Sequence, residues 1–267
     1  MTVGEAAARS TTPGRKGRKP EPDPVLLSRR GGPAERFAGA VGDRHPIVVF
    51  LLAVLSGFLL LAVASVLLAL LIVHGLASDG GLGLNDTDSS PIEFLAEHRT
   101  GTLNTISEIG TEAGGAPVLP IVVGLIGIGF AIARRWAIAA FAVFVLTVES
   151  ATYKLTSTLV PRDRPAVPRL EDLPADASYP SGHTAAAVAV YAGLVLLLSA
   201  RLTGSLRKAL CWTGVVLMVS FVALSRMYRG MHHPLDVLGG ALLGVGAILV
   251  LLFACRAAEA AAERRRS

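Results

Sequence analysis

Residues 225–236 of this chain read Ser225-Arg226-Met227-Tyr228-Arg229-Gly230-Met231-His232-His233-Pro234-Leu235-Asp236. The flanking segments, residues 209–224 and 237–254, are mostly apolar. Charged side chains at membrane depth are costly and usually functional. We therefore expect a functional turn at the point where one membrane helix ends and the next begins.

The spacing within this turn gives each polar residue a specific place. Pro234 favours the first turn of a helix, so the last membrane helix is expected to begin at residue 233 or 234. His232 then lies at the start of that helix, and Asp236 folds back toward the same side. A carboxylate there holds one ring N–H and leaves the other nitrogen free as a nucleophile or base. Arg226, at the end of the preceding helix, supplies a cation for an anionic oxygen.

Composition predicts a membrane protein. The chain has 267 residues, of which 52% are hydrophobic, and apolar segments of about 18 residues or more are typical of membrane spans. The expected spans are residues 47–73, 117–133, 136–151, 181–200, 209–225 and 234–255. We therefore expect an all-α, polytopic membrane protein with six transmembrane helices.

Basic tails flank the apolar region. Residues 1–44 are rich in Pro, Gly, Arg and Lys, and we expect them to form a disordered cytoplasmic tail. Residues 45–256 are expected to form the membrane domain, and residues 257–267 a second basic cytoplasmic tail. We assign this charge to the cytoplasmic membrane surface, as a positive-inside anchor or a binder of anionic lipid head groups. No nucleic-acid partner is expected.

Charge also predicts the orientation in a plasma membrane. The tails and the basic turns at Arg134-Arg135 and residues 201–208 are expected in the cytoplasm, together with both termini. The alternating loops are expected on the extracytoplasmic face, at residues 77–116, 152–182 and 226–235. The first of these loops is also expected to hold an amphipathic helix from Pro91 to Ile106.

A second polar patch opens the fourth expected span and reads Tyr179-Pro180-Ser181-Gly182-His183-Thr184. Ser181 is a good N-cap, and Gly182 lets a bound group approach the backbone closely. The N–H groups of a helix N-terminus, with a hydroxyl and His183 beside them, suit a phosphate. The alternative is a plain helix cap beside a hydrogen-bonded histidine.

The third patch reads Pro161-Arg162-Asp163-Arg164-Pro165. Arginines present planar donors that suit phosphate oxygens, and the prolines stiffen the turn that carries them. A solvated loop is the alternative. All three patches are expected on the same face of the membrane, which favours one shared site.

Together the patches resemble the three motifs of the type 2 phosphatidic acid phosphatase superfamily, integral membrane phosphatases whose helical core is shared with vanadium haloperoxidases. The third motif, Ser-Arg, five residues, His, three residues, Asp, is complete as Ser225, Arg226, His232 and Asp236. The second motif, Pro-Ser-Gly-His, is complete at residues 180–183. The resemblance covers roughly residues 45–255 and implies that family's helical bundle.

The first motif departs from the family pattern of Lys, six residues, Arg-Pro. Counting back from Arg164 places Ser157 at the position of the lysine. Lys154 lies about one helical turn earlier and reaches inward if the third span continues through it. We therefore retain Lys154 and Arg164 as candidate phosphate-binding residues.

The resemblance implies a phosphatase that needs neither a metal nor a cofactor. His232, oriented by Asp236, attacks phosphorus and forms a phosphohistidine, while His183 protonates the leaving oxygen and then activates water. The phosphate oxygens are held by cations and by hydroxyl and backbone donors, namely Arg164, Arg226, Ser181 and Gly182.

The expected partners are the bilayer and a lipid phosphate, because apolar helices lie directly below a phosphate site at head-group level. Candidate substrates are undecaprenyl diphosphate, phosphatidic acid, phosphatidylglycerol phosphate and a polyprenyl phosphosugar. The sequence carries no signal for an oligomeric state.

Three alternatives compete with this interpretation. The first is a zinc site formed by His183, His232, His233 and Asp236, which the neighbouring arginines disfavour. The second is a non-catalytic transporter or lipid-binding scaffold, favoured only by the missing motif lysine. The third is a vanadate-dependent haloperoxidase, which the six expected spans disfavour.

Overall fold

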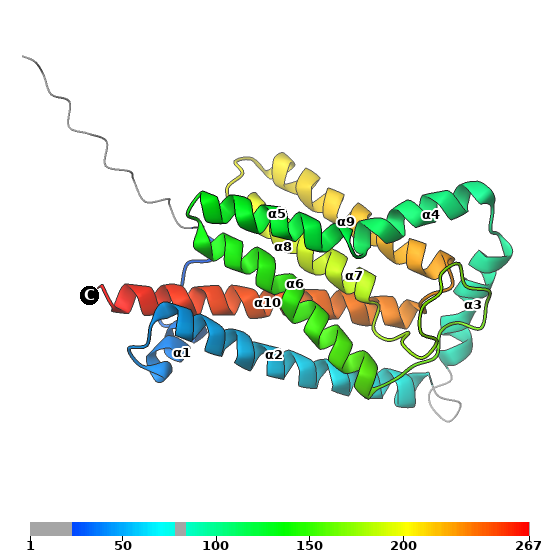
Figure 1. The fold of residues 1–267 in the computed structure, drawn as a ribbon, viewed down its shortest axis with the longest axis horizontal. Helices are drawn as coiled ribbons and strands as arrows, with labels where there is room; N and C mark the ends of the chain where they lie inside the picture. The colour runs from blue at the N-terminus through cyan, green and yellow to red at the C-terminus, as the bar shows by residue number, and fades with distance from the viewer. Residues whose placement is uncertain (1–22, 78–83, 267) are drawn as a thin grey trace, which may run out of the picture.

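The computed structural model describes residues 23–77 and 84–266, and this part of the chain forms an all-α bundle (Figure 1). Within these described residues, six helical segments are long and apolar enough to cross a membrane: Pro46–Leu76, Gly101–Ile132, Trp136–Leu159, Gly182–Ser199, Ser205–Tyr228 and Pro234–Arg264. The predicted fold class and the number of spans are thereby confirmed.

The helices have these bounds in chain order: α1 (Pro33–Val41), α2 (Pro46–Leu70), η1 (Leu71–Leu76), α3 (Leu84–Glu97), α4 (Gly101–Gly114), α5 (Val118–Ile132), α6 (Trp136–Leu159), α7 (Gly182–Ala187), η2 (Val188–Ala192), α8 (Gly193–Ser199), α9 (Ser205–Tyr228) and α10 (Pro234–Arg264). The two η segments are π-helical turns within longer helices. Prolines occupy the first turns of α2 and α10, where a missing N–H costs no hydrogen bond.

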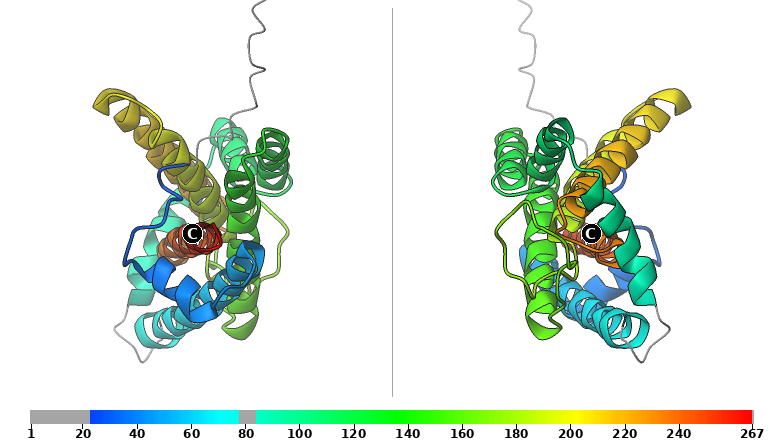
Figure 2. Two further views of the ribbon diagram at one scale, coloured as in Figure 1. Left: turned by 90° about the vertical axis from the view of Figure 1, so that its left-hand side faces the viewer. Right: turned by 90° about the vertical axis from the view of Figure 1, so that its right-hand side faces the viewer.

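Helix α10 is the centre of the bundle (Figure 2). It packs against α1, α2, α6 and α7, and its buried residues Leu251, Ala254 and Ala257 belong to the main apolar core. Outward-facing residues such as Leu60, Ile132 and Leu206 are strongly exposed, as expected for side chains that contact lipid. The apolar sequence therefore supplies both the core and the lipid-facing surface.

The two ends of the bundle differ in charge and in function. The basic α5–α6 and α8–α9 turns lie at the same end as α1 and the C-terminus (Figure 1). The α6–α7 and α9–α10 loops lie at the opposite end, together with α3. The three sequence patches are thus gathered at one end of the molecule.

The N-terminal region differs from the predicted disordered tail. Residues 1–22 lie outside the described residues, but α1 is a helix whose Ala34 and Ala38 are buried in the main core. Arg256 on α10 donates to the Val25 carbonyl at 2.8 Å, and Arg201 forms an ion pair with Asp23 at 2.8 Å. Alanines spaced four residues apart on α1 pack closely against α10, which is why this short helix is ordered despite its polar flanks.

Several helices begin or end at residues other than those predicted. Helix α10 continues to Arg264, through most of the segment expected to be a tail, because Ala257, Ala260 and Ala261 are buried. The third span continues to Leu159. The single amphipathic helix expected from residue 91 to 106 is instead two helices, α3 and α4, and α4 continues toward α5. Hydropathy did not predict these boundaries, because small and polar residues are buried on these helices as well as apolar ones.

Candidate active site

The α6–α7 loop is folded back on itself. The Arg162 N–H donates to the Asp176 carbonyl at 3.0 Å, and the Ser178 N–H donates to the Arg162 carbonyl at 2.9 Å. The Ser181 N–H then donates to the Asp236 carbonyl at 2.9 Å. These bonds bring the second and third sequence patches against the start of α10.

The α9–α10 turn depends on a glycine. Gly230 has a φ of 73°, a left-handed conformation that is unfavourable for residues with a Cβ. A Cβ at this position would also lie 2.8 Å from the Val167 side chain. The turn therefore packs tightly under the α6–α7 loop, and it places His232 directly before α10.

His232 is buried and paired with a backbone carbonyl. Its side chain is 3% exposed, and Nδ1 lies 2.7 Å from the Ser178 oxygen. A carbonyl accepts only, so Nδ1 carries the proton and Nε2 keeps its lone pair. Burial lowers the pKa of His232 well below its usual value, and the charge of Arg226 lowers it further. A neutral imidazole with a free Nε2 is suited to nucleophilic attack.

Asp236 does not make the contact that was predicted for it. Its Oδ2 lies 3.9 Å from Nδ1 of His232, too far for a hydrogen bond. Oδ2 instead accepts the Ser178 hydroxyl at 2.6 Å and the His233 N–H at 2.8 Å. The carboxylate is fully buried and positions Ser178, whose carbonyl in turn contacts His232. The spacing of four residues places the side chains of His232 and Asp236 near each other. At the first turn of α10, however, the Asp236 carboxylate caps the helix by accepting the His233 N–H.

Arg162 completes this network and was not among the predicted site residues. It is 7% exposed and forms ion pairs with Asp236 and, at 2.7 Å, with Asp88 of α3. Asp88 also accepts the Leu235 N–H at the start of α10, at 2.9 Å. Arg162 belongs to the third sequence patch, so its arginine was visible, but nothing in the sequence indicated Asp88 as its partner.

Arg226 lies at the centre of the site with unused donors. The residue is 0% exposed, and its Nη1 donates to the Thr111 hydroxyl at 2.8 Å and to Glu171. Its Nε and Nη2 are buried and have no hydrogen-bond partner among the described residues. Buried guanidinium N–H groups are normally paired, so this arrangement suits an anion that the structure does not contain.

Arg164 contacts carbonyls in this structure. Its guanidinium donates to the backbone oxygens of Pro174 at 2.8 Å and Ala177 at 3.0 Å, and also to that of Met231. Burial lowers its pKa, as does the charge of Arg226 nearby. Three of its five N–H groups have these partners. The residue therefore holds the loop against the His232 turn, and two N–H groups remain for a ligand.

His183 borders a cavity of about 270 Å³ between the α4–α5 break, α6 and α7. Its Nε2 faces Gly115, where a Cβ would lie only 3.0 Å away. Glu171 and Arg226 both interact electrostatically with its ring. His183 and His232 therefore both interact with Arg226, the residue predicted to bind the phosphate on which the two histidines act.

The residues beside His183 do not form the helix-capping hydrogen bond that was expected at the start of α7. Ser181 occupies the N-cap of α7, but its hydroxyl lies 3.0 Å from the Thr184 hydroxyl and makes no cap hydrogen bond. Gly182 lies against the Tyr153 ring, at 3.1 Å from where its Cβ would be. The absence of a side chain at Gly182 thus allows Tyr153 to approach the start of α7.

Lys154 is not brought to this site. Helix α6 does continue through it, but its side chain is exposed, and within the described chain it has no hydrogen bond or ion pair with the other site residues. Tyr153 lines the cavity beside His183 instead, and the buried Ser157 hydroxyl donates to the Lys154 carbonyl at 3.2 Å. The direction of α6 decides this outcome, because neighbouring residues on a helix point about 100° apart.

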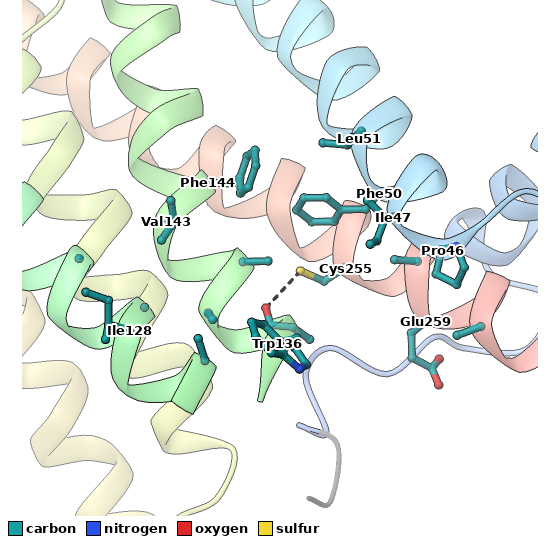
Figure 3. Close-up of a pocket in the computed structure, with 18 of the residues that line it drawn as sticks. Pro46, Ile47, Phe50, Leu51, Ile128, Trp136, Val143, Phe144, Cys255 and Glu259 are labelled. Carbon is teal, nitrogen blue, oxygen red and sulfur yellow. Dashed lines mark hydrogen bonds between the residues drawn. The ribbon is translucent and has the colours of Figure 1, made fainter. Parts of the chain in front are cut away.

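A larger groove lies at the opposite end of the bundle (Figure 3). It has a volume of about 900 Å³ and is lined mainly by apolar residues of α2, α5, α6 and α10, including Phe50, Trp136 and Phe144. The Cys255 thiol contacts the Ala137 carbonyl there at 3.8 Å. None of the predicted site residues lines it, and its apolar surface is suited to lipid chains.

The second half of the chain matches a known family of sequences. Residues 137–259 match the sequence model of the PAP2 superfamily. Over 75 residues the chain is 44% identical to a Sulfolobus acidocaldarius protein named undecaprenyl-diphosphatase, an overlap of 28% of this chain and 32% of that protein. Over 81 residues it is 38% identical to the bacitracin transport permease protein BcrC of Bacillus licheniformis, an overlap of 30% and 35%. The matches thus span about a third of the length of these relatives.

A solved structure has a similar fold. The PAP2-type phosphatidylglycerolphosphate phosphatase of Bacillus subtilis aligns with a TM-score of 0.59 and 24% sequence identity. The alignment covers 77% of this chain and 93% of that protein. At this level of identity the similarity concerns the fold.

Proposed function

We propose that this chain, whose residues 137–259 match the sequence model of the PAP2 superfamily, is a membrane phosphatase that hydrolyses the phosphomonoester or diphosphate of a lipid. The observation that carries the proposal is the group of two histidines around a fully buried Arg226 with unpaired N–H groups. A neutral nucleophile, a second imidazole and a guanidinium with two unpaired N–H-bearing atoms together suit phosphoryl transfer.

In the proposed first step, Nε2 of His232 attacks the phosphorus atom in line with the leaving oxygen. A P–N bond forms while the P–O bond to the lipid breaks, and His183 donates its proton to that oxygen. The Ser178 carbonyl supports this step. It accepts the Nδ1–H of His232, with 2.7 Å between Nδ1 and the carbonyl oxygen, and it stabilises the ring as the ring becomes positive. Arg226 and Arg164 stabilise the charge on the phosphoryl oxygens.

In the second step, water attacks the phosphohistidine and breaks the P–N bond. His183, now neutral, accepts a proton from this water, which returns both histidines to their starting states. Asp236 contributes by holding Ser178, which it contacts at 2.6 Å. We therefore assign His232 and His183 as catalytic residues and Asp236 as a positioning residue.

The substrate is proposed to be a lipid phosphate because the site lies at one end of six apolar spans. The cavity beside His183 is lined by apolar residues such as Leu119, Leu146 and Ala186, and it suits the part of a lipid next to the leaving oxygen. Undecaprenyl diphosphate, phosphatidic acid, phosphatidylglycerol phosphate and polyprenyl phosphosugars all have this chemistry.

We propose that the reaction proceeds without a metal. Among the described residues no three His, Cys, Asp or Glu side chains are grouped as metal ligands. His233 and Asp236 contact each other, and Arg162 pairs with the same carboxylate. In this assignment the positive charge that a metal would provide comes from the arginines.

The test is phosphate release by the purified protein from a panel of lipid phosphates in detergent. We expect release by the wild type to survive EDTA, to be inhibited by vanadate, and to fall by at least about a thousandfold in His232→Ala, as for loss of a nucleophile. Equal release by both proteins would contradict the proposal. Loss of activity in EDTA would contradict only its metal-free form.

A transport or lipid-binding role is the second candidate, because one relative is named as a transport permease. Such a role does not require an imidazole with a free nitrogen beside an arginine whose Nε and Nη2 have no partner among the described residues. The same assay distinguishes the two candidates, since a transporter or scaffold gives background release that does not depend on His232.

A further inference from the structure

The Glu171 carboxylate lies directly on the cation that is proposed to bind phosphate. Its two oxygens are 2.7 and 2.8 Å from Nη1 of Arg226. Oε1 is also 2.5 Å from Nε of Arg229. Burial alone would raise the pKa of Glu171, but its contacts with both arginines lower it below the usual value, so the group is an anion at neutral pH.

The neighbouring backbone holds this segment over the site. The Leu170 N–H donates to the Arg229 carbonyl at 3.1 Å, and Nη2 of Arg229 donates back to the Leu170 carbonyl at 3.1 Å. Glu171 is 20% exposed on its side chain and also borders an open cleft with Arg169 and Asp172. The carboxylate thus has the buried Arg226 on one side and an accessible surface on the other.

An empty site without Glu171 would leave Arg226 with only a neutral hydroxyl as a partner. Arg226 is 0% exposed, and an uncompensated buried charge is strongly destabilising. A carboxylate and a phosphate oxygen accept from a guanidinium in the same way. Glu171 accepts from Nη1, and a phosphate would accept from the unpaired Nε and Nη2 of the same guanidinium, so the two anions compete for one positive charge.

We propose that Glu171 is an internal competitor for the charge of Arg226, which neutralises the guanidinium in the absence of phosphate and opposes the binding of a phosphate to its remaining N–H groups. The proposal rests on the proposed function. It assigns a role to the α6–α7 loop: Glu171 weakens the binding of substrate and of the inorganic phosphate product, and the repulsion between the carboxylate and the product promotes product release.

This role has a distinctive quantitative consequence. If every anion binds to Arg226 beside the charge of Glu171, removing that charge increases the apparent affinity for all of them by about the same factor. We expect Glu171→Gln to lower the inhibition constants of inorganic phosphate and of vanadate together by roughly tenfold, the scale of one charged hydrogen bond. Its KM for a lipid phosphomonoester should fall in parallel where chemistry is slower than substrate release.

The matched control is Asp172→Asn, which removes the neighbouring carboxylate in the same loop. Asp172 is exposed, and its variant should keep the wild-type constants. Glu171→Asp retains the charge and should stay closer to the wild type than Glu171→Gln. Damage to the loop would instead weaken phosphate and vanadate binding in the glutamine variant.

Thermal unfolding provides a measurement that does not depend on turnover. Added inorganic phosphate should raise the Tm of Glu171→Gln more than that of the wild type, because binding stabilises in proportion to affinity. Equal Tm shifts and equal inhibition constants in the two proteins would overturn the proposal. If the wild type lacked His232-dependent activity, the proposed function would fail, and the phosphate-induced Tm shifts would still test the competition.

Discussion

At the scale of single residues, the most informative contact is the one between His232 and a backbone carbonyl. The sequence predicted a carboxylate as its partner, and Asp236 lies near it but bonds elsewhere. The Ser178 carbonyl selects the same tautomer that a carboxylate would select. The tautomer of the proposed nucleophile therefore depends on the loop that carries Ser178, and through it on Arg162 and Asp236.

Stability should depend on pH through His232. Its pKa in the folded protein lies well below the usual value because of burial and the charge of Arg226, while the unfolded chain takes up a proton below about pH 6.5. The unfolded state then binds more protons, so stability falls as the pH is lowered through that value. Between about pH 7.5 and about pH 5.5, the wild type should lose up to about 1.4 kcal/mol per pH unit relative to His232→Gln.

Thermal unfolding of both proteins across this pH range measures the difference. His232→Gln removes the titrating ring and keeps a neutral polar side chain, so it isolates the contribution of this residue. A constant difference in Tm between the two proteins at all pH values would show that the ring is not held neutral in the folded state.

Arg162 should be needed for stability. It compensates two buried carboxylates, Asp88 and Asp236, and Arg162→Met leaves both without their ion pair. We expect a loss of roughly 3–5 kcal/mol, as for breaking a buried pair, measured as a lower Tm. The exposed Arg169, whose Nη1 contacts only a carbonyl, offers the matched control Arg169→Met, which should be nearly neutral.

A second substitution tests the cause of this loss. Adding Asp88→Asn to Arg162→Met removes one of the two uncompensated charges and should recover part of the stability. If Arg162→Met were as stable as Arg169→Met, the ion pairs would contribute little to the fold.

At the scale of helices, the relative position of the two histidines depends on close packing of α7 against α10. A Cβ added at Gly240 would lie 2.3 Å from the Ser181 carbonyl, and one at Gly244 would lie 2.5 Å from the Ala185 carbonyl. Small residues four apart allow two helix backbones to approach closely in a membrane. His183 starts one of these helices and His232 precedes the other, so this crossing sets the distance between them.

Gly240→Ala should therefore impair catalysis. The added methyl group pushes the start of α7 away, and a displacement of about 1 Å at the reacting groups costs on the order of 100-fold in rate. The control is Gly214→Ala on α9, where a Cβ would have no neighbour within 4 Å. That variant should keep wild-type activity and gain up to about 1 kcal/mol from helix propensity.

Phosphate release by the two purified variants measures the effect. Unimpaired activity in Gly240→Ala would mean that α7 can shift without separating the histidines. Equal losses in both variants would instead point to a general effect of alanine on this protein.

At the scale of the whole molecule, the bundle separates basic turns from the candidate active site. The C-terminus, α1 and the turns after α5 and α8 lie at one end, and the loops with His183 and His232 lie at the other (Figure 1). By the positive-inside rule we expect the first end to face the cytoplasm. In that orientation the proposed site would act on lipids of the outer leaflet.

Cysteine labelling tests this orientation. In a background with both native cysteines, Cys211 and Cys255, replaced by alanine, Asp172→Cys and Ser205→Cys introduce exposed thiols at opposite ends. A membrane-impermeant maleimide should label the former in intact cells and the latter only after permeabilisation. The reverse pattern would place the site in the cytoplasm.

Much of this architecture follows from the sequence. Long apolar segments predicted six spans, alternating basic turns predicted which loops share an end, and Pro234 predicted where α10 begins. These features are readable because hydropathy, charge and proline act locally along the chain. The same local patterns identified the three patches that form the candidate site.

The tertiary structure alone decided how the side chains of that site are paired. Asp236 contacts His233 and Arg162 instead of His232. Lys154 is exposed, and Glu171 contacts Arg226, which is 55 residues away in the chain. Ordering of α1 against α10 was also invisible in the composition of the N-terminal segment. The physical reason is that a hydrogen bond requires atoms within about 3 Å in a suitable direction, and the packing of helices distant in sequence fixes such positions.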